Sequence, residues 1–156
     1  MKICEFLSPE RIVLDIVCRD KAESLQNAAR LLAVSGVASD WQALYDGMAA
    51  REALMSTGVG NGIGIPHASG PFVIAPSAAL LRLLSPVDFE AIDRRPVDLL
   101  IAVAVPEGDQ RTHLSLLAGI ARLCKNPQFL SAVHKAKDPG KLFNRIRNLE
   151  KEMAFH

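Results

Sequence analysis

Apolar residues recur along the chain at two different spacings. Between residues 11 and 17 apolar and β-branched residues partly alternate with polar ones, which predicts a strand. Between residues 21 and 34 they fall at helical spacing, and Gly36 would end that helix. Asp40 is suited to cap a second helix that runs to about residue 53.

The second half of the chain continues the alternation of strands and helices. We predict strands over residues 78–84 and 97–105 and helices over residues 112–124, 127–136 and 139–151. The strand over 97–105 is apolar on both faces, as a buried central strand should be. Asn126 and Asp138 each precede a proline and so fit helix caps. The fold class is therefore α/β: one domain, residues 1–156, with a sheet covered by helices on both faces.

Composition narrows the class of protein. Of 156 residues, 49% are apolar and 22% are charged, which is typical of a soluble globular domain. The net charge of +1 gives no excess of positive charge that would indicate nucleic-acid binding. No apolar run is long enough to cross a membrane, so we expect no direct membrane insertion. Three scattered cysteines, Cys4, Cys18 and Cys124, suit a reducing cytoplasm and argue against a disulfide framework or a zinc site.

The chemistry concentrates in residues 58–67, which read GVGNGIGIPH. Neither G-x-G-x-x-G nor a Walker loop fits this run. Alternating glycines leave backbone N–H groups open to an anion, so Gly60, Asn61, Gly62 and Gly64 are expected to form a phosphate loop. Pro66 fixes the backbone just before His67. We interpret His67 as a nucleophile that carries a phosphoryl group.

Each residue of this site also has a plainer interpretation. The glycines could form a tight turn around an ordinary, partly buried His67. His113, near a helix start, could donate a hydrogen bond to a phosphoryl oxygen, or could simply be a polar residue of the first turn. Arg51 could bind a phosphate through its forked donors, or could be a solvated side chain beside Glu52.

Other chemistries fit less well. A metal site on His67 and His113 would need further ligands, and no acidic or cysteine residue is suitably spaced. The surroundings of Ser69 lack the G-x-S-x-G pattern of a serine hydrolase. We interpret His134 as a helix-surface residue and His156 as part of a frayed terminus. No metal and no other cofactor is expected.

With these residues in place, the chain resembles a IIA domain of the bacterial phosphoenolpyruvate-dependent phosphotransferase system, in the fructose, mannitol and nitrogen-regulatory class. The resemblance covers nearly the whole chain. It lies in Arg51-Glu52, Ser56-Thr57-Gly58, residues 60–67, and later blocks at 89–93, 96–100 and 112–114.

The resemblance implies roles for the site residues and partners for the chain. His67 would be the phosphorylated residue, His113 the second active-site histidine, and Arg51 the arginine beside the phosphate. The fold it implies is an α/β sandwich with a mixed sheet. The phosphoryl donor would be an HPr-like phosphocarrier protein. We expect a shallow site with an apolar rim, on which Phe72 or Met55 would lie.

Asn61 bears on the subtype. Sugar-specific members commonly carry a glutamate at this position, so the chain resembles the nitrogen-regulatory branch there. Members of that branch are expected to act on regulatory protein targets. Potassium transporters and sensor kinases are the kinds of target that the resemblance suggests. The alternative is a sugar-system IIA that passes its phosphoryl group to a IIB domain of a fructose- or mannitol-type permease.

Overall fold

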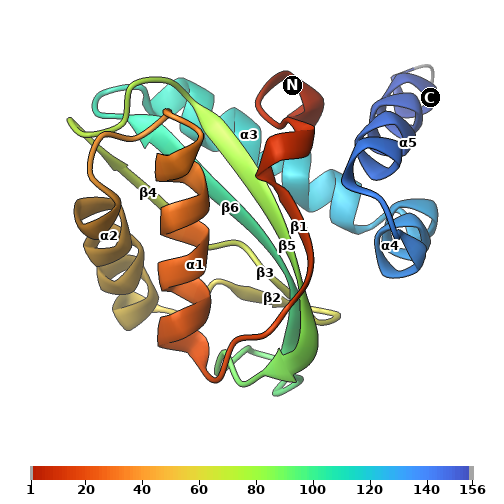
Figure 1. Ribbon diagram of the computed structural model, residues 1–156, viewed down its shortest axis with the longest axis horizontal. Helices are drawn as coiled ribbons and strands as arrows, with labels where there is room; N and C mark the ends of the chain where they lie inside the picture. The colour runs from red at the N-terminus through yellow and green to blue at the C-terminus, as the bar shows by residue number, and fades with distance from the viewer. Residues whose placement is uncertain (1, 155–156) are drawn as a thin grey trace.

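A mixed six-stranded sheet forms the centre of the protein in a computed structural model that describes residues 2–154 (Figure 1). The strands are β1 (Ile12–Ile16), β2 (Gly58–Gly60), β3 (Ile63–Gly64), β4 (His67–Gly70), β5 (Ser77–Val87) and β6 (Val97–Pro106). They run in the order β1-β5-β6-β3-β2, and β4 also pairs with β6. The β5–β6 and β2–β3 pairs are antiparallel, and the other three are parallel. The predicted α/β fold with a mixed sheet is confirmed.

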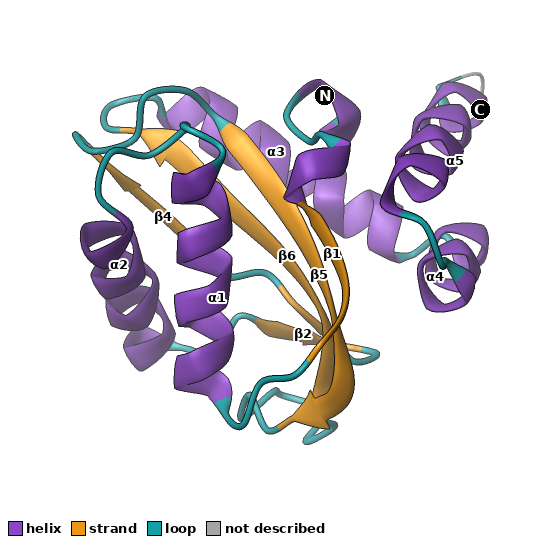
Figure 2. Ribbon diagram, in the orientation of Figure 1, coloured by secondary structure: helices purple, strands orange, loops and turns teal. Residues whose placement is uncertain are grey.

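Helices cover both faces of this sheet, as the sequence predicts (Figure 2). One face carries α1 (Lys21–Val34) and α2 (Trp41–Leu54), and the other carries α3 (Gln110–Cys124), α4 (Pro127–Lys135) and α5 (Pro139–Met153). Two short 3-10 turns, η1 (Ile3–Glu5) and η2 (Pro9–Arg11), precede β1. The predicted caps are in place: the side chains of Asp40, Asn126 and Asp138 each accept a backbone N–H in the first turn of their helix.

Strand β6 divides the core into two layers. Leu99, Ile101 and Val103 point to the α3–α5 side, whereas Leu100 and Ala102 point to the α1–α2 side, and all five are essentially inaccessible to solvent. This strand has paired neighbours on both edges, so it needs apolar residues on both faces. The prediction of a buried central strand at 97–105 is confirmed.

The glycine-rich run, which the sequence predicts to be a loop, contains two short strands. Gly58–Gly60 and Ile63–Gly64 are the two strands of a tight hairpin, and the chain then continues along the edge of β6 as β4. Ile63 and Ile65 point into the α3–α5 core, as expected from alternation. Strand β4, which starts at His67, was not among the predicted strands.

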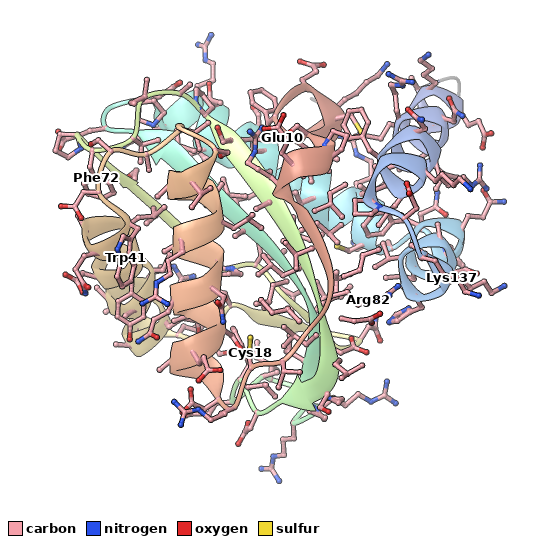
Figure 3. All side chains as sticks on the ribbon, in the orientation of Figure 1. Glu10, Cys18, Trp41, Phe72, Arg82 and Lys137 are labelled. Carbon is pink, nitrogen blue, oxygen red and sulfur yellow. The ribbon has the colours of Figure 1, made fainter. Side chains whose placement is uncertain are left out.

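Arg82 ties the C-terminal helices to the sheet. From β5 its guanidinium donates to the carbonyls of Val133 and Ala136 at 2.8 and 2.6 Å, and it pairs with Asp15 at 3.0 Å (Figure 3). The Val133 carbonyl otherwise accepts only the long 3.4 Å bond from Ala136 N–H, and the last carbonyls of a helix have no partner within the helix, so this side chain supplies donors to the end of α4.

We expect Arg82→Met to lower the free energy of unfolding by about 2 kcal/mol, because it removes the donor to the partly buried Ala136 carbonyl and the shorter of the two bonds to the Val133 carbonyl. Urea unfolding followed by circular dichroism measures this. Arg19→Met, at an arginine whose side chain is 84% exposed, is the control and should change little. A loss below about 0.5 kcal/mol in Arg82→Met would show that the guanidinium does not anchor α4.

Candidate functional site

His67 is held in one ring orientation by its own backbone. It is the first residue of β4, opposite Val103 of β6, and its Nδ1 lies 2.7 Å from the carbonyl oxygen of Ile65. A carbonyl can only accept, so Nδ1 must carry the proton of the neutral ring and donate it. The lone pair then resides on Nε2, which becomes the nucleophilic nitrogen.

The break between β3 and β4 makes this contact available. Ile65 N–H donates to the carbonyl of Thr57 at 3.0 Å, and the carbonyl of Pro66 accepts from Val103 N–H at 2.9 Å. The Ile65 carbonyl lies between these two ladder bonds and accepts from the imidazole. Pro66, which has no N–H, fits this break without leaving a donor unpaired.

His113 lies against His67 from the first turn of α3. The two ring centroids are 5.2 Å apart and the ring planes meet at 77°, so the rings are edge to face. The Nε2 atom of His113 is buried and has no hydrogen-bond partner among the described residues. A buried polar atom without a partner costs about 1–3 kcal/mol, so it fits an atom that awaits a ligand oxygen.

The surroundings of His67 and His113 favour neutral imidazole rings, and the positive charge of Arg51 lies near them. Burial lowers the pKa of His67 below 6.5; the hydrogen bond to Ile65 opposes this shift, and the positive charge of Arg51 adds to it. Burial and then the nearby His67 also lower the pKa of His113. Arg51, in the last turn of α2, donates to the Met55 carbonyl at 2.8 Å. The structure thus brings together the three residues predicted to contact the phosphoryl group.

The predicted phosphate loop has another place and another task. Asn61 and Gly62 form the turn of the β2–β3 hairpin, with φ angles of 57° and 78°. Asn and Gly tolerate this left-handed backbone better than other residues, and they favour such hairpin turns. The turn is therefore what Gly60, Asn61 and Gly62 are needed for.

The position of this turn also speaks against anion binding there. On β6 the hairpin pairs at Leu99 and His67 pairs at Val103, four residues on, which is about 13 Å along a strand. A carboxylate oxygen of Asp93 accepts the N–H of Asn61 at 3.1 Å. The Asn61 N–H is thus already occupied by a carboxylate, and a phosphate-binding role for Gly60, Asn61, Gly62 and Gly64 stays a prediction.

Gly58 and Gly64 allow the 89–93 segment to pack closely against the hairpin. A Cβ on Gly64 would lie 3.2 Å from the ring of Phe89, and one on Gly58 would lie 2.7 Å from the Cβ of Ala91. Phe89, Ala91 and Asp93 alternate along the 89–93 segment and contact the hairpin from its base to its turn. The glycines that looked like open backbone are sites of close packing.

Exposed apolar side chains follow two of the predicted site residues in the sequence. Leu54 and Met55 follow Arg51 and are 83% and 62% exposed, and Leu114 follows His113 and is 69% exposed. Phe72 is partly buried, because its ring packs over Gly70 and against the α1–α2 core (Figure 3). Met55 therefore suits the predicted rim better than Phe72. Leu54 and Leu114 are further exposed apolar residues off the buried stripes of their helices.

The other histidines lie away from this pair or outside the described residues. His134 is exposed on α4, 3.5 Å from a carboxylate oxygen of Asp98, and His156 lies outside the described residues. Within residues 2–154, no three His, Cys, Asp or Glu side chains gather as a metal site would require. In that same part of the chain, every helix is too short or too polar to cross a membrane.

Comparison of the sequence with known proteins identifies one family. The family model described as phosphoenolpyruvate-dependent sugar phosphotransferase system, EIIA 2, matches residues 5–149. The chain is 39% identical over 123 residues to the nitrogen regulatory protein of Pseudomonas aeruginosa, covering 79% of this chain and 80% of that protein. It is 32% identical over 151 residues to the fructose-specific EIIABC component of Bacillus subtilis, covering 97% of this chain but only 24% of that protein.

The fold gives the same answer. The crystal structure of the nitrogen regulatory protein IIA-Ntr from Neisseria meningitidis superimposes with a TM-score of 0.84 at 29% identity, over 92% of this chain and 98% of that one. The matched segment, residues 5–149, contains the whole sheet and the paired histidines. The chain therefore belongs to the EIIA 2 family of the phosphoenolpyruvate-dependent sugar phosphotransferase system, and among its relatives it is most like the nitrogen regulatory IIA proteins.

Proposed function

We propose that this chain carries a phosphoryl group on Nε2 of His67, accepted from an HPr-like phosphocarrier protein. The observation that carries the proposal is the geometry of the imidazole pair. The Nδ1 proton of His67 is engaged by Ile65, which leaves the Nε2 lone pair free, and the unpartnered Nε2 of His113 lies on the neighbouring ring. The chain would act as a transferase in a relay, in the cytoplasm.

The transfer step needs positioning and charge stabilisation. The Nε2 lone pair of His67 attacks the phosphorus of a donor phosphohistidine whose other ring nitrogen is protonated; a new N–P bond forms, the donor N–P bond breaks, and its electron pair returns to the donor ring, which leaves as a neutral imidazole. The proton stays on Nδ1 of His67, which continues to donate to the Ile65 carbonyl, so no general base is required. Protonated at Nε2, His113 would donate to a phosphoryl oxygen, and Arg51 would balance its charge. No metal is needed.

We further propose that the output is mainly regulatory, through proteins that distinguish the phosphorylated from the unphosphorylated state. The similarity to nitrogen regulatory proteins supports this. Asn61 supports it less than the sequence suggested, because the positive φ of the hairpin turn is itself a reason for asparagine there. By family resemblance, the regulated proteins would include potassium transporters or sensor kinases.

A second candidate function is transfer to a IIB domain of a fructose- or mannitol-type permease. The match to a fructose-specific EIIABC component favours it. Mixing the labelled protein with isolated permease IIB domains separates the two functions. Rapid loss of label to IIB would favour the sugar relay, and retention would favour the regulatory role.

Incubation with a phosphorylated HPr-like carrier tests the central proposal. We expect label that is stable in base and lost in acid, as for a histidine phosphoramidate, and we expect none in His67→Ala. His134→Ala, which alters a histidine on another element, should be labelled normally. Acid-stable label, or full labelling of His67→Ala, would refute the assignment.

The charge of Arg51 should be visible in the titration of His67. We expect Arg51→Gln to raise the pKa of His67, because removing a nearby positive charge makes the protonated ring easier to form. In the unaltered protein the midpoint should lie below 6.5, so His67 remains neutral and nucleophilic into mildly acidic solution. A pH titration of the ring by ¹H–¹⁵N NMR measures both values. An unchanged or lower midpoint in Arg51→Gln, with Arg19→Gln as control, would contradict the proposed field.

The apolar rim should matter for docking of the donor. We expect Met55→Asp and Leu114→Asp each to lower kcat/KM for phosphoryl uptake by about tenfold or more, because a buried charge at the centre of an interface is costly. Val34→Asp, at an apolar residue at the end of α1 that is 85% exposed, is the control for adding a charge to an exposed apolar position. Uptake as fast in both rim variants as in Val34→Asp would place the docking surface elsewhere.

A further inference from the structure

A carboxylate lies buried next to Arg51, where the proposed chemistry makes no use of it. Glu52 is 8% exposed, and its side chain turns inward from the last turn of α2. It pairs with Lys21 of α1 at 2.6 Å. A buried charge is costly unless it is paired and hydrogen-bonded, so the contacts of Glu52 are the place to look for its task.

Glu52 holds the start of the hairpin that leads to His67. Its two carboxylate oxygens lie 3.1 and 3.2 Å from the backbone N of Thr57 and accept that N–H, and one of them also accepts the Thr57 hydroxyl. Thr57 is the residue immediately before β2. Its side chain and backbone are both fixed by the same carboxylate, and Thr57 is itself only 4% exposed.

From Thr57 two further hydrogen bonds reach the imidazole. The Thr57 carbonyl accepts from Ile65 N–H at 3.0 Å, and the Ile65 carbonyl accepts from Nδ1 of His67 at 2.7 Å. Each bond fixes one backbone unit against the next, from helix α2 through the hairpin base to the ring. The end of this path is the contact that determines which ring nitrogen is free.

We propose that Glu52 is a positioning residue for His67: through Thr57 and Ile65 it holds the ring in its Nδ1–H form and so directs phosphoryl transfer to Nε2. This inference rests on the proposed function for its catalytic consequence only. The ring form itself is a property of the resting protein.

The role is one of placement and not of proton relay. The Thr57 N–H and the Thr57 carbonyl belong to different peptide groups, and the same holds for Ile65, so no single dipole is polarised from end to end. Lys21 balances the charge of Glu52, which leaves the field at His67 to Arg51. What the path requires from Glu52 is therefore an acceptor for Thr57, and the negative charge is dispensable.

That distinction gives a sharp pair of variants. Lys21→Met/Glu52→Leu replaces the ion pair by apolar side chains of similar volume, a change that buried ion pairs often tolerate, and removes the acceptor. Lys21→Met/Glu52→Gln also removes both charges but retains an amide oxygen for Thr57. Glu150→Gln is a control at a second carboxylate that is 8% exposed and that accepts the N–H groups of Ile3 and Cys4 on the opposite face of the sheet.

The readouts are the ¹⁵N shifts of the His67 ring at a pH where it is neutral, and the rate of phosphoryl uptake from a phosphorylated HPr-like carrier. We expect the unaltered protein, the Gln double variant and Glu150→Gln to show protonated Nδ1. The Leu double variant should show a substantial share of the Nε2–H form and at least tenfold slower uptake than the Gln double variant.

Three results would overturn the inference: an Nε2–H ring in the unaltered protein, an unchanged ring form in the Leu double variant, or equal changes in both double variants. The first needs no variant, so the test survives a Leu variant that does not fold. If the unaltered protein takes up no phosphoryl group but the ring form responds as expected, the proposed function fails and the positioning role stands.

Discussion

The hydrogen bond between Nδ1 of His67 and the carbonyl of Ile65 is the constraint on which the account depends. It selects one form of a ring that in water would sample both, and it aims the remaining lone pair. The bond exists only because the chain leaves the ladder of β6 between β3 and β4. Three features fix the position of that break. They are the β2–β3 hairpin that precedes it, the 89–93 segment that packs against the hairpin, and the carboxylate of Glu52 that binds Thr57.

Phosphorylation would change the local charge more than the local shape. A phosphoryl group adds nearly two negative charges at neutral pH. Here it would sit among exposed apolar side chains, with Arg51 beside it and the buried Nε2 of His113 available. A partner that covers the apolar rim would have to desolvate that charge or supply its own cations, so the same surface can favour different partners in its two states. Under the proposed regulatory function, this change in charge would be the signal that partners detect.

Much of the fold could be predicted from the sequence because its long elements are strongly patterned. Helix α1 and strand β6 match their predictions closely, since one has a clear apolar stripe and the other is apolar throughout. His67, His113 and Arg51 could be named as well, but only the resemblance joined them. Their spacing in sequence carries no sign that α2, β4 and α3 converge.

The sequence could not assign a single role to the glycines, and the reason is physical. A glycine can mark open backbone, a positive φ or a neighbour pressed close, and the sequence does not distinguish these. Gly60 and Gly62 have positive φ, while Gly58 and Gly64 face Ala91 and Phe89. Glu52 escaped notice for a related reason. The sequence showed it only as the neighbour of Arg51, and tertiary structure reveals that it turns inward to Lys21 and Thr57.

The most direct test of the account is to identify which nitrogen of His67 bears the phosphorus. Phosphorylation of ¹⁵N-histidine-labelled protein, followed by NMR detection of ³¹P–¹⁵N coupling, gives the answer in a single spectrum. The account predicts coupling to Nε2, with Nδ1 still protonated against the Ile65 carbonyl. Coupling to Nδ1 would contradict it, because the phosphoryl group would then occupy the position that this hydrogen bond holds.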